Sequence, residues 1–362
     1  MSNNKQIKSL SSMVTMKDIA EELKIDRTTV SKVLNGHSGL SEKTRKQVLE
    51  TAERLGYRKD VFASGLMTRK NKILGMVVSD LSRGLFSPVV KQFQLEAKKH
   101  DYGVILCSLD SDDQHESNLE QLALLKLQRV SGVTFISNGS TKIDEDYIKA
   151  YLDDGIAFNS LELSVPIDTV DQMYFNHCKA GEELTEYLLS LGHRKIAFLT
   201  YSPSLQAYQS TRDRMQGYVN AMEKAGLKPV TFLEENSYSE SYGHEVHIAY
   251  ELLRRQWNKD DALTAIIGAN DSFAIGILHA LKDIGYHVPN DVSVAGFDDL
   301  YAEMGVPSIT SMKMPVGAAG EMAAKLLVEK INQKKQQRQP QKIWLDYTMV
   351  ARESIAPIQS DK

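Results

Sequence analysis

Residues 15–35 read TMKDIAEELKIDRTTVSKVLN and predict two short helices joined by a tight turn. Thr15 can cap the first helix, because Asp18 stands three residues further on as its reciprocal partner. Asp26 can cap the second helix. Apolar side chains recur at helical spacing in both segments, as Ile19, Ala20 and Leu23 and then as Val30, Val33 and Leu34. The pattern therefore predicts a small unit with a shared apolar core.

The second helix leaves polar side chains facing outward, namely Arg27, Thr28, Thr29, Ser31 and Lys32. An apolar unit that points Arg, Thr, Ser and Lys away from its core is typical of a helix-turn-helix, whose second helix enters the major groove of DNA. On these residues alone, the alternative is a helical hairpin with a solvated polar face.

A third helix completes the unit. Asn35-Gly36 ends the second helix, Ser41 can cap a third, and that helix stops at Gly56. Four motifs follow one another here: T-x-K-D-I-A, T-V-S-K-V-L-N-G, S-E-K-T-R and L-G-Y. In this order and at this spacing they closely resemble the headpiece of the lactose-repressor/galactose-repressor family of bacterial transcription regulators. The resemblance favours the DNA-binding interpretation.

Charge is distributed unevenly along the 362 residues. The whole chain has a formal net charge of -4, yet residues 1–72 contain 15 Lys and Arg against 8 Asp and Glu. The remaining residues contain 28 Lys and Arg against 39 Asp and Glu. A basic head on an acidic body indicates a polyanionic partner for the head only.

Cysteine usage and hydropathy indicate the compartment. The two cysteines, Cys107 and Cys178, are too few for a disulfide framework. No signal peptide is visible, and no apolar run is long enough for a membrane span. We therefore expect a protein of the bacterial cytoplasm that associates with the nucleoid and has no membrane partner.

Downstream of the head, the pattern changes to alternating strands and helices. A first series covers 73–158, a break follows near 169–174, and a second series covers 178–297. Two such series predict an α/β fold of two doubly wound parallel sheets with a cleft between them. A last helix over 316–331 and a last strand over 343–349 are expected to cross back and tie the two lobes together.

Three parts are expected along the chain. Residues 1–57 form a helix-turn-helix headpiece, residues 58–72 a hinge or linker, and residues 73–362 a two-lobed core of periplasmic-binding-protein type. The expected lobes are about 73–173 with 302–333 for lobe 1 and about 174–301 with 334–362 for lobe 2.

The family resemblance extends through the core to about residue 355. Its motifs are L-G-H-R-K-I-A-F (191–198), R-M-Q-G-Y (214–218), A-I-I-G-A-N-D (265–271), V-P-N-D-V-S-V-A-G-F-D-D (288–299) and P-S-I-T-S (307–311). The resemblance implies a sugar-binding-protein-like core that forms homodimers and binds a small effector in the cleft. It implies double-stranded operator DNA as the partner of the head.

The resemblance also implies which residues contact DNA. Arg27, Thr28 and Lys32 match family positions that reach base edges, and arginine can pair with guanine at two points. Hydroxyl and amide side chains suit phosphate oxygens. The remaining DNA-contacting set in the head is Thr15, Thr29, Ser31, Asn35, Ser41 and Thr44, each of which could instead be a solvated surface group.

Residues 58–70, RKDVFASGLMTRK, form the joint. In the resembling family this segment becomes a short hinge helix on specific DNA, and a leucine from it wedges into the minor groove, which kinks the duplex. Ala63 and Leu66 match the family's alanine and leucine. A plain charged linker is the alternative, because the chain departs from the family at Lys59, Asp60 and Ser64.

An effector pocket is implied in the same way. Arg214 matches the family's pocket arginine, Tyr238 an aromatic that stacks on the ligand, and Phe86 a loop that lines the pocket. Asp271 faces the cleft in the resembling fold, where carboxylates accept from ligand hydroxyls; its alternative role is helix capping. Arg83 stands where the family has Asn-Pro. It predicts an anionic effector such as a sugar phosphate or sugar acid, with a solvent-exposed loop arginine as the alternative.

These observations predict a sequence-specific DNA-binding regulator that represses genes of carbohydrate uptake or catabolism. A sugar-type effector would switch operator affinity by shifting a two-state population. The alternative is a sugar-binding solute receptor without a regulatory role. An enzyme is not expected, because the chain has no G-x-S-x-G, no phosphate-binding glycine loop and no zinc-ligand spacing. No cofactor or metal is expected.

Overall fold

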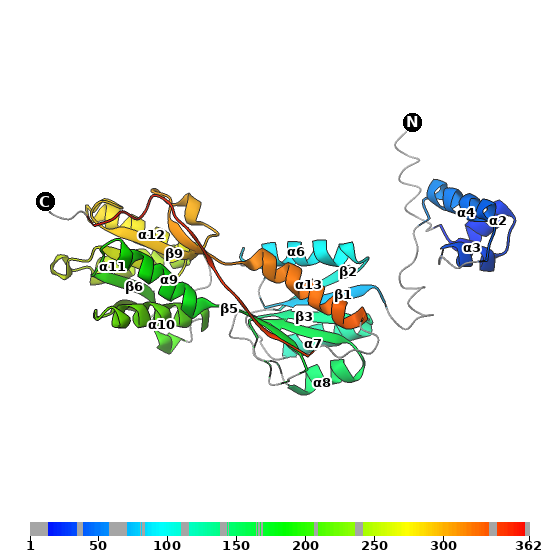
Figure 1. The fold of residues 1–362 in the computed structure, drawn as a ribbon, viewed down its shortest axis with the longest axis horizontal. Helices are drawn as coiled ribbons and strands as arrows, with labels where there is room; N and C mark the ends of the chain where they lie inside the picture. The colour runs from blue at the N-terminus through cyan, green and yellow to red at the C-terminus, as the bar shows by residue number, and fades with distance from the viewer. Residues whose placement is uncertain are drawn as a thin grey trace. The chain divides into compact units, whose positions relative to one another are not determined.

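The computed structural model describes residues 14–34, 39–57, 71–79, 81, 84–109, 116–137, 143, 145–163, 165, 167, 169–205, 209–235, 242–332 and 339–358. The chain divides into two compact units, Met1–Asn71 and Lys72–Lys362, which Figure 1 shows coloured along the sequence.

The first unit contains three described helices: α2 (Met16–Leu23), α3 (Arg27–Leu34) and α4 (Glu42–Leu55). A capping box between Thr15 and Asp18 begins α2, as the sequence predicts. Ser41 begins α4 by accepting a hydrogen bond from the Thr44 N–H, and Gly56 ends it in the left-handed conformation at φ 71°. The predicted caps at Thr15 and Ser41 and the predicted stop at Gly56 are therefore confirmed. The stop at Asn35-Gly36 lies outside the described residues.

The head core consists of small and branched apolar side chains. Its buried members are Ile19, Ala20, Val30, Val33, Val48 and Ala52. Arg54 of α4 also pairs with Glu22 of α2 at the surface. Each helix thus contributes one apolar face to a common core, and the polar faces remain outside.

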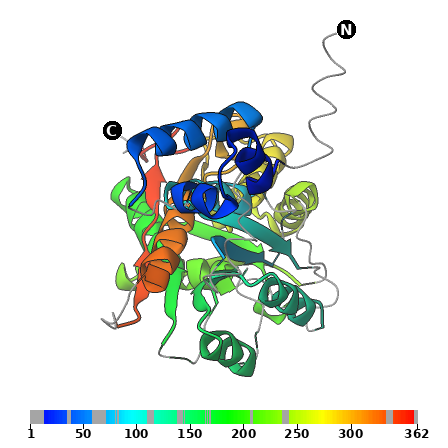
Figure 2. The same ribbon diagram turned by 90° about the vertical axis from the view of Figure 1, so that its right-hand side faces the viewer.

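Lobe 1 of the second unit is an all-parallel sheet in the order β11-β5-β4-β3-β1-β2. Its strands are β1 (Ile73–Val78), β2 (Gly103–Ser108), β3 (Gly132–Ile136), β4 (Ala157–Leu161), β5 (Asp171–Phe175) and β11 (Lys342–Leu345). Helices α6 (Phe86–Lys99) and α13 (Val316–Asn332) cover one face, and α7 (Glu116–Leu127) and α8 (Glu145–Asp153) cover the other (Figure 1; α13 is orange there and in Figure 2). Covering both faces explains why the central strands read as continuous apolar runs.

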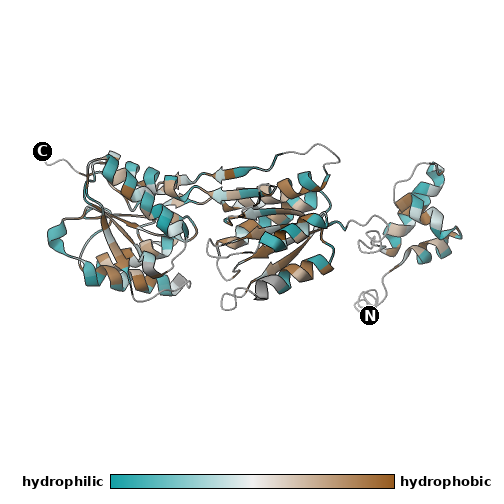
Figure 3. Cartoon of the chain, turned by 90° about the horizontal axis from the view of Figure 1, so that it is seen from below, coloured by the Kyte–Doolittle hydropathy of each residue, from teal (hydrophilic) through white to brown (hydrophobic). Residues whose placement is uncertain are grey.

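Lobe 2 is a second sheet in the order β12-β10-β9-β8-β6-β7, with only β12 antiparallel to its neighbour. Its strands are β6 (Ile196–Tyr201), β7 (Val230–Glu234), β8 (Ala265–Gly268), β9 (Ser293–Asp298), β10 (Thr310–Lys313) and β12 (Thr348–Val350). The helices are α9 (His177–Ser190), α10 (Gln209–Lys224), α11 (Tyr242–Gln256) and α12 (Asp271–Asp283), with short 3₁₀ turns at η1 (Pro203–Leu205), η2 (Lys259–Asp261) and η3 (Ala302–Met304). Figure 3 shows hydrophobic strands inside and hydrophilic residues on the outer helix faces.

Helices α9 and α10 approach closely because two glycines lie at their contact. A Cβ on Gly181 would overlap the carbonyl of Arg214, and one on Gly217 would overlap the carbonyl of Cys178. Larger residues at either position would push apart the two helices that carry His177 and Arg214.

The chain passes between the lobes three times: between β5 and α9, between β10 and α13, and between β11 and β12. The strand pairing differs from the expected lobe boundaries. Strand β10 lies in lobe 2 although 302–333 was expected in lobe 1, and β11 lies in lobe 1 although 334–362 was expected in lobe 2. Pairing partners far apart in the sequence decide these memberships, so local pattern could not assign them.

Two further expectations need correction. The break expected near 169–174 is strand β5, whose polar residues Asp171 and Gln172 are buried. The Gln172 side chain bonds both backbone groups of Val165, and Asp171 accepts from the Gln341 N–H. The single strand expected over 343–349 is two strands in different sheets. The α/β class with two doubly wound parallel sheets is confirmed.

Candidate functional site

The exposed face of α3 is the candidate DNA-contacting surface. Arg27, Thr28 and Lys32 are exposed on it. The opposite side of the helix is buried in the head core at Val30 and Val33. The helix is therefore held by its apolar side and offers an arginine, a lysine and a hydroxyl to base edges and phosphates.

Some residues expected at DNA also hold the head together. The Thr15 hydroxyl donates to Oδ2 of Asp18 at 2.7 Å, and the Thr15 N–H donates to the same oxygen at 2.6 Å. These bonds hold the pKa of Asp18 below its ordinary value. The hydroxyls of Ser41 and Thr44 lie 2.8 Å apart. Phosphate contacts by these residues stay predictions, because their hydroxyls already serve the helix starts.

The remaining DNA-contacting predictions are also untested. Thr29 and Ser31 are half-buried on α3. Asn35 of the turn and the hinge residues Ala63 and Leu66 lie outside the described residues.

A cleft in the second unit is lined from both lobes. Its apolar walls include Phe86, Leu161, Phe175 and Met314, and its polar groups are those of Ser137, Glu162, His177 and Ser210. The cleft has a free volume of about 40 Å³, which holds a few water molecules but no sugar ring. A sugar can therefore bind in the cleft only if its walls move apart.

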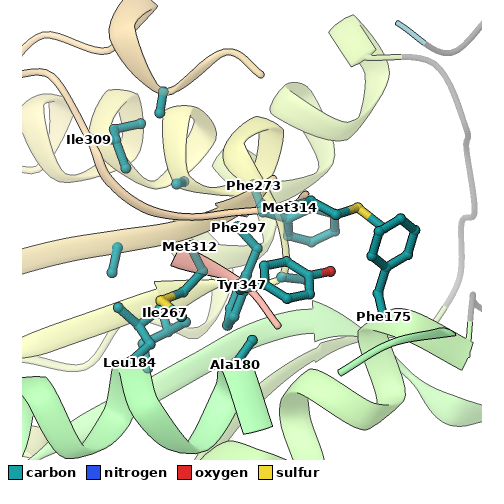
Figure 4. Close-up of a cluster of buried hydrophobic side chains, with 14 of the residues drawn as sticks. Phe175, Ala180, Leu184, Ile267, Phe273, Phe297, Ile309, Met312, Met314 and Tyr347 are labelled. Atoms are coloured by element: carbon teal, nitrogen blue, oxygen red, sulfur yellow. The ribbon is translucent and has the colours of Figure 1, made fainter. Parts of the chain in front are cut away.

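The three chain crossings meet beside this cleft. Phe175 ends β5, Met314 follows β10 and Tyr347 lies between β11 and β12, and all three side chains are buried. The rings of Phe175 and Tyr347 lie edge to face with centroids 6.4 Å apart. Figure 4 shows the three side chains grouped together, with Phe297 of β9 beside Tyr347. Movement of the cleft walls must therefore disturb contacts of every crossing.

A chain of hydrogen bonds leads from the cleft into lobe 2. Oε2 of Glu162, the residue after β4, lies 3.0 Å from Nε2 of His177, and Nδ1 of His177 lies 2.7 Å from the Tyr347 hydroxyl. Arg214 of α10 donates to that hydroxyl at 2.9 Å and to Oδ1 of Asp298 at 2.5 Å. Five side chains thus connect lobe 1 through two crossings to lobe 2. We refer to them as the cross-lobe chain.

Tyr347 stands at the centre of this chain, between Arg214 and His177. Burial raises the pKa of the Tyr347 hydroxyl, so that hydroxyl keeps its proton. It accepts from Arg214 at 2.9 Å and lies 2.7 Å from Nδ1 of His177, whose Nε2 faces the Glu162 carboxylate at 3.0 Å. Both ring nitrogens of His177 therefore have a polar partner.

Arg214 is committed to partners inside lobe 2. Its side chain is 3% exposed, donates to the Ala269 carbonyl at 2.8 Å and lies over the Phe297 ring. Burial alone would lower the pKa of Arg214, but the charge of Asp298 and the contact with Tyr347 raise it above its ordinary value. The guanidinium therefore stays charged in place, and its two terminal nitrogens are paired. Its Nε is buried without a hydrogen-bond partner in the described part of the chain.

Asp271 is likewise occupied inside lobe 2. It is the first residue of α12, and the cap of that helix is Asn270. Oδ2 of Asp271 accepts from the N–H groups of Leu300 and Tyr301 at 2.7 and 3.0 Å, and Oδ1 accepts from the Ser311 hydroxyl at 2.7 Å. Burial raises the pKa of this carboxyl to about 7. Asp271 thus fastens the loop after β9 to α12.

The residues expected at the effector site have different surroundings. Phe86 lines the cleft, whereas Arg214 and Asp271 are not among its described lining residues and have the internal partners given above. Arg83 and Tyr238 lie outside the described residues. An effector-binding role for all five stays a prediction.

Glu162, His177 and Tyr347 were not expected from the sequence. Glu162 and His177 follow the carboxyl ends of β4 and β5, where open α/β sheets bind their ligands. That position is a signal that could have found Glu162. It could not find His177, because β5 itself was not recognised. Tyr347 gives no local signal, since it lies between short strands of different sheets.

Across the described ranges, no group of three or more His, Cys, Asp or Glu side chains could hold a metal ion. In the same part of the chain, no helix is both long enough and apolar enough to cross a membrane.

A head that exposes a basic helix, followed by a two-lobed core with a cleft, defines a DNA-binding protein with a ligand-binding core. Residues 15–60 match the model of bacterial regulatory proteins of the lacI family, and residues 185–355 match the periplasmic binding protein-like domain. Catabolite control protein A of Priestia megaterium is 30% identical over 324 residues, which cover 88% of this chain and 93% of the relative. The chain belongs to the LacI family of bacterial regulatory proteins.

Solved structures share this fold. The lac repressor dimer bound to operator and the anti-inducer ONPF superposes with a TM-score of 0.77 at 23% identity, over 95% of this chain and 100% of that one. The complex of the transcriptional regulator CelR with cellobiose superposes with a TM-score of 0.63 at 24% identity, over 94% and 99%. As a member of the family, the protein is a DNA-binding transcriptional regulator of the cytoplasm and not an enzyme. Family membership does not support a solute receptor without a regulatory role.

Proposed function

We propose that the protein represses genes of carbohydrate uptake or catabolism and that a sugar-type effector in the cleft switches its operator affinity. Two heads of a homodimer bind the halves of a pseudo-palindromic operator in the nucleoid. In each head, Arg27, Thr28 and Lys32 read base edges. Catabolite control in a relative and cellobiose in the CelR complex support the carbohydrate class.

The domain organisation belongs to this proposal. Residues 1–57 act as headpiece and residues 58–72 as the joint to a core over 73–362. The division of the chain into compact units after Asn71 supports these boundaries. The strand pairing favours lobe boundaries that assign β10 to lobe 2 and β11 to lobe 1.

One observation carries the regulatory half of the proposal: polar groups of the cleft belong to the cross-lobe chain. A ligand that bonds Glu162 must compete with or extend its bond to His177. Tyr347 and Arg214 lie further along the same chain, so arrangements of the lobes that keep these bonds and arrangements that break them differ in their affinity for the ligand. A ligand with such a difference shifts the population between them.

The test is selection of duplexes from a random DNA pool by the full-length protein. We expect enrichment of a pseudo-palindrome with two half-sites related by dyad symmetry. The proposal would be contradicted if no sequence were enriched. It would also be contradicted if the enriched duplexes carried a single half-site bound by one protomer. A thermal-shift screen of sugars on the same protein then tests the effector half, because a cleft ligand stabilises the native state by mass action.

A further inference from the structure

We infer that Leu300 and Tyr301 of lobe 2 form a latch that holds the empty cleft shut by closing on Gly84 of lobe 1. Release of this contact shifts the protein toward the arrangement that admits a sugar. The inference rests on the proposed function, because it concerns the movement through which a ligand in the cleft would switch operator affinity.

The latch contact joins the two lobes beside the cleft. Gly84 lies between β1 and α6, and the two residues that follow it, Leu85 and Phe86, line the cleft. A Cβ on Gly84 would lie 3.0 Å from the Tyr301 hydroxyl oxygen and 3.3 Å from Cδ2 of Leu300. The two latch side chains therefore rest on the bare backbone of Gly84, and a side chain at this position would push them away.

Asp271 fixes the position of the latch within lobe 2. Its Oδ2 accepts from the N–H groups of both Leu300 and Tyr301, and its Oδ1 accepts from the Ser311 hydroxyl of β10. The oxygen of that hydroxyl accepts from the Asp299 N–H at 3.2 Å. Because these bonds tie the latch backbone to α12 and β10, the latch moves with lobe 2.

The loop that carries the latch is strained as well as anchored. Asp298 and Asp299 have φ of 94° and 56°, in the left-handed region that a residue with a Cβ seldom adopts. The Asp299 carboxylate forms ion pairs with Lys313 and Arg352. Strain of this kind is retained where the surroundings hold a segment for a task, and this turn of the chain carries the latch to lobe 1.

The same loop is connected to the other contacts between the lobes. Asp298 is the last member of the cross-lobe chain through its bond with Arg214, and its carbonyl accepts from the Met314 N–H at 3.3 Å. Met314 lines the cleft. When the cleft walls separate, either Gly84 leaves the latch or the latch leaves Asp271. The first loses only van der Waals contacts, whereas the second breaks hydrogen bonds of a buried carboxyl, so the contact with Gly84 opens.

The latched arrangement excludes the ligand, because its cleft has a free volume of only about 40 Å³. A protein that is mostly latched therefore binds sugar with an apparent Kd raised by the inverse of the unlatched fraction. A wedge that releases the latch should tighten sugar binding. It should also move operator affinity without sugar in the direction in which the sugar moves it in wild type.

The first variant is Gly84→Leu in the full-length protein. The φ of Gly84 does not lie in the left-handed region, so its backbone accepts a side chain and the substitution acts on the contact. Calorimetry with glucose, ribose and cellobiose as probes should show the sugar that binds doing so at least about threefold more tightly than to wild type. Fluorescence anisotropy on the selected operator, without sugar, should shift in the direction that this sugar produces in wild type.

Gly84→Ala keeps the test decisive if Gly84→Leu fails to fold. It adds only the Cβ, which meets the far ends of two flexible side chains, and it should shift both affinities in the same direction by a smaller factor.

Tyr301→Ala is the control that separates the latch from general damage. It removes the ring that the wedge meets. In a protein that carries Tyr301→Ala, adding Gly84→Leu should therefore produce at most about half of the shift that it produces alone. Equal shifts in the two backgrounds would show that Gly84→Leu does not act through Tyr301.

The failures of the inference and of the proposed function are distinguishable. If a probe binds wild type and changes its operator affinity, but both glycine variants bind that probe equally or more weakly, the latch is contradicted and the proposed function stands. An operator shift opposite to that of the sugar also contradicts the latch alone. If no probe binds wild type or Gly84→Leu while both still bind the selected operator, the latch and the effector half of the proposed function fail together, and DNA binding stands.

Discussion

At the scale of single residues, Arg27 decides whether α3 reads bases or only holds phosphates. Arg27→Ala should weaken binding to the selected operator by about 1–3 kcal/mol and relax the preference at one base pair of each half-site. Fluorescence anisotropy on the operator and its single-base variants measures both effects. Arg27→Lys is the matched control, because it keeps the charge but loses the planar fork. Equal loss of affinity for every duplex in Arg27→Ala would make Arg27 a phosphate contact.

The raised pKa of Asp271 predicts that the free energy of unfolding depends on pH. Its pKa rises from the ordinary 3.8 to about 7 in the native state. A native pKa above the unfolded one means that the native state binds the proton more tightly. The protonated carboxyl therefore makes its full contribution to the free energy of unfolding below about pH 4. This contribution is lost as the pH rises through about 7.

Asp271→Asn removes this titration while keeping an oxygen for the Leu300 and Tyr301 N–H groups. Between about pH 4 and 8, wild type should lose stability relative to Asp271→Asn by on the order of 1–4 kcal/mol. Urea unfolding across that range measures the difference. Parallel stability curves for the two proteins would show that the carboxyl does not titrate there.

At the scale of elements, the start of α4 depends on one hydroxyl. Ser41→Ala should cost the head about 1 kcal/mol, because the Thr44 N–H loses its acceptor. Hydrogen exchange of the α4 amides in the full chain reports this as faster local opening. Ser41→Asn, which keeps a capping oxygen, should exchange like wild type. If both variants exchange like wild type, the cap contributes nothing measurable.

The helices and strands also show which parts of the fold can be predicted from the sequence. Helix α2 with its Thr15 cap and the apolar core strands were predictable, because caps and periodicity are local. Strand β5 was missed because DQMYF mixes polar and apolar residues, and its buried polar groups are satisfied by segments that sequence does not place nearby.

The site shows the same division between local and distant signals. Phe86 was expected at the pocket from the family resemblance, and it lines the cleft. The cross-lobe chain joins Glu162 to Asp298 through partners up to 170 residues apart, and no local pattern specifies such a path. Only the strand-end rule, applied to β4, could have indicated Glu162.

At the scale of the whole molecule, Tyr347 should connect the lobes energetically. Tyr347→Phe leaves an Arg214 N–H and the Nδ1 of His177 without their partner, which should cost about 1–3 kcal/mol of stability. It should also reduce the effect of the sugar on operator affinity. Tyr174→Phe removes a lobe 1 hydroxyl that donates to Gln172 and is the matched control. A sugar response that is equal in both variants would exclude the cross-lobe chain as the coupling route.

The central claim is that cleft and head are coupled, and the most direct measurement is operator affinity as a function of the sugar that the thermal-shift screen identifies. Anisotropy titrations of wild type at zero and saturating sugar should differ by about 5- to 150-fold. Calorimetry of the sugar with and without operator should give the same factor, because coupling between two binding sites is reciprocal. A sugar that binds the cleft with equal affinity in free and operator-bound protein would contradict the account.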